Sequence, residues 1–157
     1  MINRSLITRE GYKTLIEKLH ALTTTGRIKI ANDLHVAREH GDLSENAGYQ
    51  YAKDMQAHNE AKIAKLQEFL SGVEVVDPFI GKSEFVSFGC TARVKNLETD
   101  DTKTITIVGE TESSPKSGKI SYRSPFGKEI IGKSPGDDFE VEAPGGESYW
   151  EILEILG

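Results

Sequence analysis

Two carboxylates three positions apart stand out in the segment Ala37–Tyr49. They belong to Asp42 and Glu45, and residues three apart at the start of a helix can present their side chains in one direction. Hard cations such as Mg²⁺ take carboxylate oxygens and keep several waters, so this pair could complete an ion site whose other ligands lie on a partner. The alternative is helix capping, with Asp42 or Ser44 as the N-cap and Glu45 at the positive end of the next helix. From the residue types alone, capping is the favoured interpretation.

Other motifs that could carry chemistry are less specific. The segment Gly127–Ser134 has the phosphate-loop pattern G-x-x-x-x-G-K-[ST], but Pro135 and Gly136 would stop the helix that such a loop must open. We therefore interpret it as a chance match. The four histidines have neither i,i+4 pairing nor cysteine partners, which argues against a zinc site. Cys90 lies in an alternating segment and is expected to be a small core residue.

Length and charge restrict the classes of protein that the chain can represent. Its 157 residues suit one or two compact domains, and no apolar run approaches the roughly 18 to 20 residues that cross a bilayer. One cysteine and no hydrophobic signal segment predict a reducing compartment, the cytoplasm. With 19 Lys+Arg against 25 Asp+Glu the net charge is -6, which argues against a general electrostatic grip on nucleic acid. Any nucleic-acid contact is therefore expected to be local.

Apolar periodicity places the two carboxylates at the tip of a helical hairpin. Apolar residues recur on one stripe across Tyr12–Ala37, which predicts one long helix that Thr8 can cap and that is weak at Thr23–Gly26. A second stripe alternates steps of four and three across Ala52–Val73, which is a heptad seam. Helices joined by a short turn bury such stripes against each other, so we predict an antiparallel coiled-coil hairpin with its tip at residues 41–45.

The chain after residue 77 has the composition of a β domain. All five prolines lie there, and Pro78 marks a boundary because proline removes a backbone donor and disfavours helix in the residue before it. Alternating and β-branched segments predict a hairpin within residues 90–108 and another around the turn Ala143–Gly146. The predicted fold class is α+β, with a helical hairpin domain at residues 1–77 and a small antiparallel β domain at residues 78–157.

Two long segments resemble one known family. The run Ala37–Tyr49, Ala-Arg-Glu-His-Gly-Asp-Leu-Ser-Glu-Asn-Ala-Gly-Tyr, followed by Tyr51-Ala-Lys, resembles the signature of the GreA/GreB bacterial transcript cleavage factors. Residues 120–133 resemble the family segment I-S-x-x-S-P-x-G-x-x-L-x-G-K, and Pro144-Gly-Gly resembles its late turn. The resemblance covers essentially the whole chain. The acidic balance and the few basic residues near the tip make the chain more similar to GreA than to GreB.

This resemblance implies a fold and a function. The C-terminal domain would have an FKBP-like fold and dock on RNA polymerase, while the hairpin enters the secondary channel of the polymerase. The factor would be no enzyme itself and would need no cofactor of its own, because it stimulates the Mg²⁺-dependent hydrolysis of backtracked nascent RNA by the polymerase. Asp42 and Glu45 match the family's acidic tip residues, which help to hold the second catalytic Mg²⁺ and the attacking water.

The resemblance also assigns binding residues and partners. Arg38 and Lys53 match a basic patch, and Tyr49 a tip aromatic, that would meet the 3′ end of the backtracked RNA. A weak DNA contact through the elongation complex, no membrane partner and a monomeric state are further expectations. The sequence departs from the family pattern at two places. Gly48 stands where the family usually has glutamate, and the pair that begins at Asp54 stands where a second acidic residue is common. The resemblance therefore does not fix the affinity of the tip for an ion. The residues expected to dock on the polymerase are Ser124, Pro125, Phe126 and Gly127.

Three other functions compete with transcript cleavage. An inhibitory paralogue that occupies the same channel would carry extra acidic residues at the tip, where this chain has only Asp42 and Glu45. A peptidyl-prolyl isomerase is suggested by the implied FKBP-like fold, although fold does not give function. A coiled-coil adaptor would not need paired carboxylates at the hairpin turn.

Overall fold

The computed structural model describes residues 4–41, 46–77 and 83–157, which divide into two compact units. One unit is the helical segment Tyr12–Gly72, and the other combines the chain up to Gly11 with Val73–Gly157. The sequence placed the division at residue 77. The structure groups both ends of the helical segment with the β unit because β1 (Leu6–Ile7) pairs in parallel with β2 (Glu74–Val75). A short parallel ribbon thus joins the two chain segments that flank the helical segment in the sequence.

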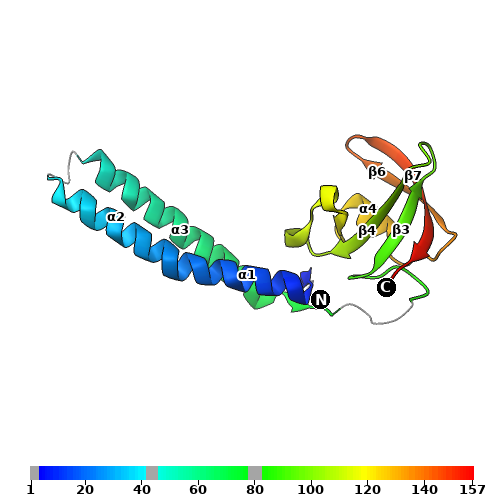
Figure 1. The fold of residues 1–157 in the computed structure, drawn as a ribbon, viewed down its shortest axis with the longest axis horizontal. Helices are drawn as coiled ribbons and strands as arrows, with labels where there is room; N and C mark the ends of the chain where they lie inside the picture. Colours follow the sequence, from blue (N-terminus) through cyan, green and yellow to red (C-terminus); the bar gives the residue numbers. More distant parts are fainter. Residues whose placement is uncertain (1–3, 42–45, 78–82) are drawn as a thin grey trace. The chain divides into compact units, whose positions relative to one another are not determined.

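The helical unit is a hairpin, as the apolar periodicity predicted. Helix α1 (Arg9–Ala21) continues through the turn η1 (Leu22–Gly26) into α2 (Arg27–Glu39), and α3 (Ala47–Gly72) returns beside α2 (Figure 1). Apolar seam positions of both helices are buried. They are Leu34 and Ala37 of α2 and Ala52 and Ile63 of α3. No helix in the described ranges is long and apolar enough to cross a membrane.

The predicted weak point of the first helix is a π-helical turn at Leu22–Gly26. The hydroxyls of Thr23 and Thr24 donate back to backbone carbonyls of the preceding turn, at 2.7 to 3.1 Å. Across the hairpin, the buried Asn59 donates from Nδ2 to the Leu22 carbonyl at 3.1 Å. Such bonds satisfy the carbonyls that a widened turn releases from the helical ladder. The turn is therefore held by specific partners on both helices.

The β unit contains a five-stranded sheet in the order β5-β4-β3-β7-β6. The sequence predicted an antiparallel sheet, but the sheet is mixed. β5 runs parallel to β4, because the chain between them crosses back through two short 3-10 turns. The other strand pairs are antiparallel. The strands are β3 (Thr91–Asn96), β4 (Thr102–Val108), β5 (Lys119–Ser121), β6 (Asp138–Ala143) and β7 (Gly146–Ile155), and the turns are η2 (Glu110–Glu112) and η3 (Pro115–Ser117).

Helix α4 (Pro125–Ile130) packs against β6 and β5 and closes the core of the β unit. The Phe126 ring makes edge-to-face contacts with Phe139 and Trp150, each at a centroid distance of 5.3 Å. Cys90 is buried in the same core, as predicted. The phosphate-loop match is excluded by this arrangement, because the helix precedes Gly132 instead of following it, and Gly132 itself turns with a φ of 89°.

Leu6 and Thr8, which precede α1, are fixed within the β unit. The Leu6 amide donates to the Tyr122 hydroxyl at 3.1 Å, and the Thr8 amide donates to Glu112 Oε2 at 3.1 Å. Thr8 is the predicted cap of α1, since its hydroxyl oxygen accepts from the Gly11 amide at 3.0 Å. The same hydroxyl donates to Glu112 Oε1. Glu112 therefore anchors the residue at which α1 begins.

Candidate functional site

At the tip of the hairpin, the side chain of Asn46 forms hydrogen bonds with both α2 and α3. Asn46 Oδ1 accepts from the Tyr49 amide at 3.0 Å, which makes Asn46 the N-cap of α3. Its Nδ2 donates to the Ala37 carbonyl in the last turn of α2, a carbonyl that also accepts from the His40 amide at 3.2 Å. The capping interpretation assigned the N-cap to Asp42 or Ser44, and the structure gives that role to Asn46. Asparagine is a favoured N-cap, so its residue type was the available signal.

Three predicted RNA-binding residues come together beside this cap. The Arg38 guanidinium carbon lies 5.7 Å from the centroid of the Tyr49 ring, and Lys53 Nζ lies 5.9 Å from it. Arg38 belongs to α2 and is exposed, whereas Tyr49 and Lys53 belong to α3 and are half-buried. Both distances fall within the range of cation–π attraction. The hairpin thus assembles one cluster from both of its arms.

The electrostatics of this tip cluster (Arg38, Tyr49 and Lys53) favour negative charge. Hydrogen bonding by Arg38, followed by the positive charge of Lys53, lowers the pKa of the Tyr49 phenol from its usual value. Two cations on an aromatic ring offer a nucleic acid both a phosphate contact and a surface on which a base can stack. The arrangement suits the end of a single strand.

Asp42 and Glu45, the predicted catalytic and metal-binding pair, lie outside the described residues. The segment that carries them is bracketed by Gly41, whose φ is 124°, and by the cap residue Asn46. A φ in this range is one that glycine adopts without strain, so Gly41 suits the departure of the chain from α2. Both carboxylates are therefore within a few residues of the tip cluster along the chain.

The predicted docking segment begins the short helix α4. Ser124 is its N-cap, accepting from the Gly127 amide at 3.1 Å and donating to the Ser121 carbonyl at 2.7 Å. Gly127 is buried, and a Cβ there would lie 2.1 Å from the Ser121 oxygen. The Phe126 ring faces the core aromatics, so of these four residues Pro125 is the exposed one. Packing thus explains why Phe126 and Gly127 stand at these positions.

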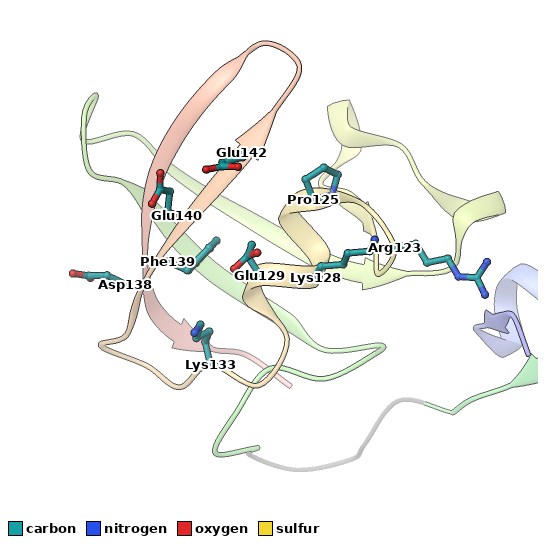
Figure 2. A pocket seen from close by; sticks show the side chains of 9 residues that line it. All are labelled: Arg123, Pro125, Lys128, Glu129, Lys133, Asp138, Phe139, Glu140 and Glu142. Atoms are coloured by element: carbon teal, nitrogen blue, oxygen red, sulfur yellow. The ribbon is translucent and has the colours of Figure 1, made fainter. Parts of the chain in front are cut away.

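A cavity of about 660 Å³ opens beside Pro125 (Figure 2). Its lining mixes both signs of charge over the apolar ring of Phe139. The charged residues that line it are Arg123, Lys128 and Lys133, and Glu129, Asp138, Glu140 and Glu142. The sequence did not reveal this cavity, because its lining is gathered from Arg123 before α4, from α4 itself, from β6 and from the loop between α4 and β6.

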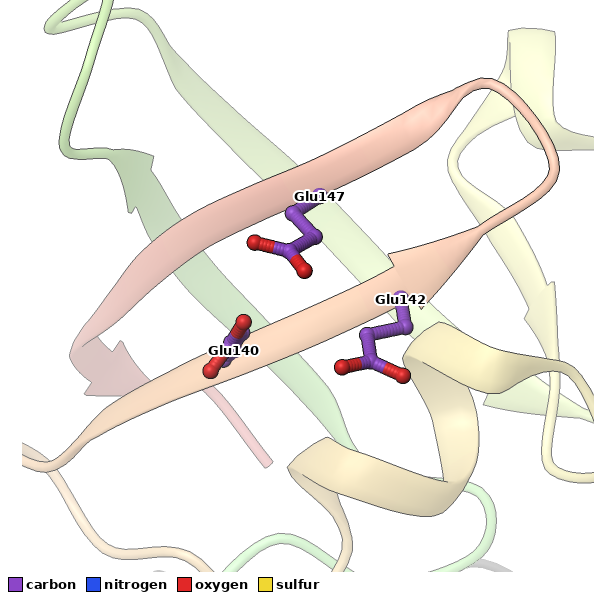
Figure 3. A group of neighbouring side chains, drawn as sticks. All are labelled: Glu140, Glu142 and Glu147. Atoms are coloured by element: carbon purple, nitrogen blue, oxygen red, sulfur yellow. The ribbon is translucent and has the colours of Figure 1, made fainter.

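One group of three carboxylates is close enough to share a cation among the residues that the structure describes. Glu140, Glu142 and Glu147 lie on the β6–β7 hairpin with oxygens within 4.8 Å of one another (Figure 3). Glu142 is directly opposite Glu147, and like charges in that position destabilise a strand pair. Glu140 and then Glu147 raise the pKa of Tyr149 by the same repulsion of negative charge. All three glutamates are exposed, and we assign this group no ion.

Models of known families match the chain over both of its parts. Residues 5–75 match "Transcription elongation factor, N-terminal" and residues 81–156 match "Transcription elongation factor, GreA/GreB, C-term". The chain belongs to the GreA/GreB family of transcription elongation factors, which confirms the resemblance of the tip segment and of residues 120–133.

Individual curated proteins of this family are similar to the chain over nearly its full length. The chain is 43% identical over 154 residues to transcription elongation factor GreA of Nautilia profundicola, covering 98% of this chain and 95% of the relative. It is 41% identical to GreA of Helicobacter pylori strain Shi470, with 98% and 94% covered. Among solved structures, GreA factor homolog 1 of Thermus thermophilus is 24% identical, with 99% and 100% covered and a TM-score of 0.43.

Proposed function

We propose that this protein binds bacterial RNA polymerase, enters its secondary channel and stimulates cleavage of backtracked nascent RNA, so that arrested complexes resume elongation. The observation that carries the proposal is the tip cluster. Arg38 and Lys53 approach one aromatic ring from the two arms of the hairpin, beside the segment that holds the paired carboxylates. Membership of a transcription elongation factor family supports the same function.

In this proposal the polymerase remains the enzyme and the hairpin supplies ligands. Carboxylate oxygens are the donors that Mg²⁺ prefers, so Asp42 and Glu45 fit an ion shared with the polymerase active site. When bound there, such an ion supplies the activated water and charge stabilisation of two-metal phosphate chemistry. The two carboxylates would hold and orient this ion. Arg38 and Lys53 bind phosphates of the extruded RNA, and the Tyr49 ring contacts a base.

The β unit would dock on the polymerase. Of the predicted docking segment, Pro125 is exposed and Ser124 is half-buried, and Pro125 borders the cavity of Figure 2. We propose that this rim, including the neighbouring Arg123, contacts the polymerase. Separate surfaces for docking and for chemistry allow each to be tested alone.

The decisive experiment is transcript cleavage by halted, backtracked polymerase complexes. We expect the double variant Asp42→Asn, Glu45→Gln to lose stimulated cleavage while it still binds polymerase, because amides cannot replace charged Mg²⁺ ligands. The matched control is Glu17→Gln, Asp33→Asn, which removes two exposed hairpin carboxylates nine or more residues before Asp42 and should cleave like the wild type.

The other functions predict different results. Wild-type protein that binds the complexes and slows both cleavage and elongation would assign the inhibitory role instead. Unchanged cleavage by the double variant would reject the tip mechanism. Proline isomerisation of a test peptide, with no effect on halted complexes, would favour the isomerase.

A further inference from the structure

A second cavity in the β unit has a different chemistry from the one beside Pro125. Its volume is about 570 Å³, within the range of pockets that take specific ligands. The apolar part of its lining includes Ile105, Ile120, Phe126 and Trp150. Phe126 therefore lines this cavity in addition to making its core contacts.

The charged residues that line this second cavity are both lysines. They are Lys103 of β4 and Lys116 of η3, and no described carboxylate lines the cavity, although acidic residues outnumber basic ones in the chain by 25 to 19. Neither lysine forms an ion pair with any residue within the described ranges. Two uncompensated positive charges beside an apolar lining select a ligand that is both apolar and anionic.

The aromatic wall of this cavity is held in place before any ligand arrives. The Trp150 indole donates from Nε1 to Ser148 Oγ at 2.9 Å, and its ring packs edge-to-face with Phe126. Lys103 Nζ lies 5.7 Å from the Trp150 ring centroid. The indole N–H already has a hydrogen-bond partner, and the Lys103 ammonium already lies over the ring. Ligand binding therefore has to immobilise few additional side chains.

We infer that this cavity docks an acidic segment of a partner protein. One apolar side chain of the segment enters against Phe126 and Trp150, and flanking carboxylates meet Lys103 and Lys116. The two lysines come from separate elements, so a chain that carries a carboxylate on each side of its apolar residue can reach both. Hot spots of this kind combine a buried anchor with a charged rim.

Charge favours a protein segment over a nucleic acid as the occupant. Residues 78–157 hold nine basic and fourteen acidic side chains. A polyphosphate chain meets that negative field along its whole length, whereas a peptide with a few carboxylates is anchored chiefly by its apolar residue. The inference involves neither the tip cluster nor the proposed docking rim of Ser124, Pro125 and Arg123, so its failure would leave the proposed function standing.

The test uses the full-length protein and the fluorescence of Trp150, the single tryptophan of the chain. The probe is the blocked peptide Asp-Glu-Leu-Glu-Asp. Its controls are Asn-Gln-Leu-Gln-Asn, which lacks charge, Asp-Glu-Ala-Glu-Asp, which lacks the anchor, and a ten-residue oligouridine. We expect a saturable change with the first peptide and a much weaker one with each control.

Variants identify the site. Lys103→Ala and Lys116→Ala should each weaken binding about two- to fivefold, the range for an exposed ion pair. The matched control Lys119→Ala removes an exposed lysine of β5 that does not line the cavity, and it should bind like the wild type. Because Lys103→Ala alters the tryptophan environment itself, amide NMR shifts at Thr104 and Gly118 provide a second readout.

Four results would overturn the inference. Three of them are the absence of a saturable change with the acidic peptide, equal responses to charged and uncharged peptides, and equal weakening by Lys119→Ala and Lys116→Ala. The fourth is tighter binding of oligouridine than of the peptide, which would assign the cavity to nucleic acid instead.

Discussion

Replacing Asn46 by alanine should loosen the tip of the hairpin without unfolding its body. The change removes the N-cap bond to the Tyr49 amide, at 3.0 Å, and the bond to the Ala37 carbonyl that joins the two arms. Loss of an N-cap costs about 1 kcal/mol, and a net hydrogen bond about 0.5 to 1.5 kcal/mol. The Ala37 carbonyl keeps its bond from the His40 amide, so its desolvation penalty is avoided. We therefore expect a local cost of about 1.5 to 2.5 kcal/mol.

Amide hydrogen exchange measures this local cost. A change of about 1.5 to 2.5 kcal/mol corresponds to roughly ten- to seventyfold faster exchange at the first turn of α3, with little change near Ile63. Asn46→Asp is the informative comparison, because a carboxylate keeps the cap acceptor but replaces the donor to the Ala37 carbonyl with an acceptor oxygen. It should fall between the wild type and Asn46→Ala in exchange and in stimulated cleavage. Equal exchange at the first turn of α3 in wild type and Asn46→Ala would refute the assignment of Asn46 as the residue that joins the arms.

Further predictions concern the tip cluster and the π-helical turn. Arg38→Ala with Lys53→Ala should reduce cleavage most on deeply backtracked complexes and at low salt, because each phosphate contact releases a counterion; an equal loss at all depths and salt concentrations would contradict this. Arg38→Ala should raise the pKa of Tyr49 toward its usual value, since the hydrogen bond from Arg38 favours the phenolate; NMR titration of the labelled tyrosine ring measures it. Asn59→Ala should lower the free energy of unfolding by about 1 to 3 kcal/mol, because the Leu22 carbonyl loses its partner; urea denaturation measures it.

Much of the helical unit follows from the sequence. Regular spacing of Leu34, Ala37, Ala52 and Ile63 was sufficient to predict the hairpin, because the helical period is a local property of the chain. The threonine-rich interruption at Thr23–Gly26 was visible as a weak point. Its π-helical geometry depends on the partner that Asn59 supplies from the other arm, and no local pattern encodes that partner.

In the candidate site, too, the sequence predicted the residues but not the contacts that depend on the packed arms. Arg38, Tyr49 and Lys53 were predicted from a family motif, and the structure adds that one ring joins both cations. The bridge from Asn46 to the Ala37 carbonyl needs the packed arms, so spacing alone could not reveal it. The parallel pairing of β5 with β4 was missed for a related reason: strand direction is set by how the intervening chain crosses the sheet.

The π-helical turn constrains how the length of this arm can vary. In a regular α-helix, one residue more or fewer rotates everything after it by about 100°, since a helical turn takes 3.6 residues. The π-helical turn is wider and rotates less per residue, so it accommodates an extra residue in the arm. Deleting one threonine from Thr23–Thr25 would therefore restore an ordinary helix while Leu34 stays near the seam and Arg38 near the Tyr49 ring. Elsewhere in the first arm, insertions and deletions are tolerated only in steps of about three or four residues, or with a compensating change in α3. The threonine stretch thus absorbs one residue and keeps the base of the hairpin in phase with its tip.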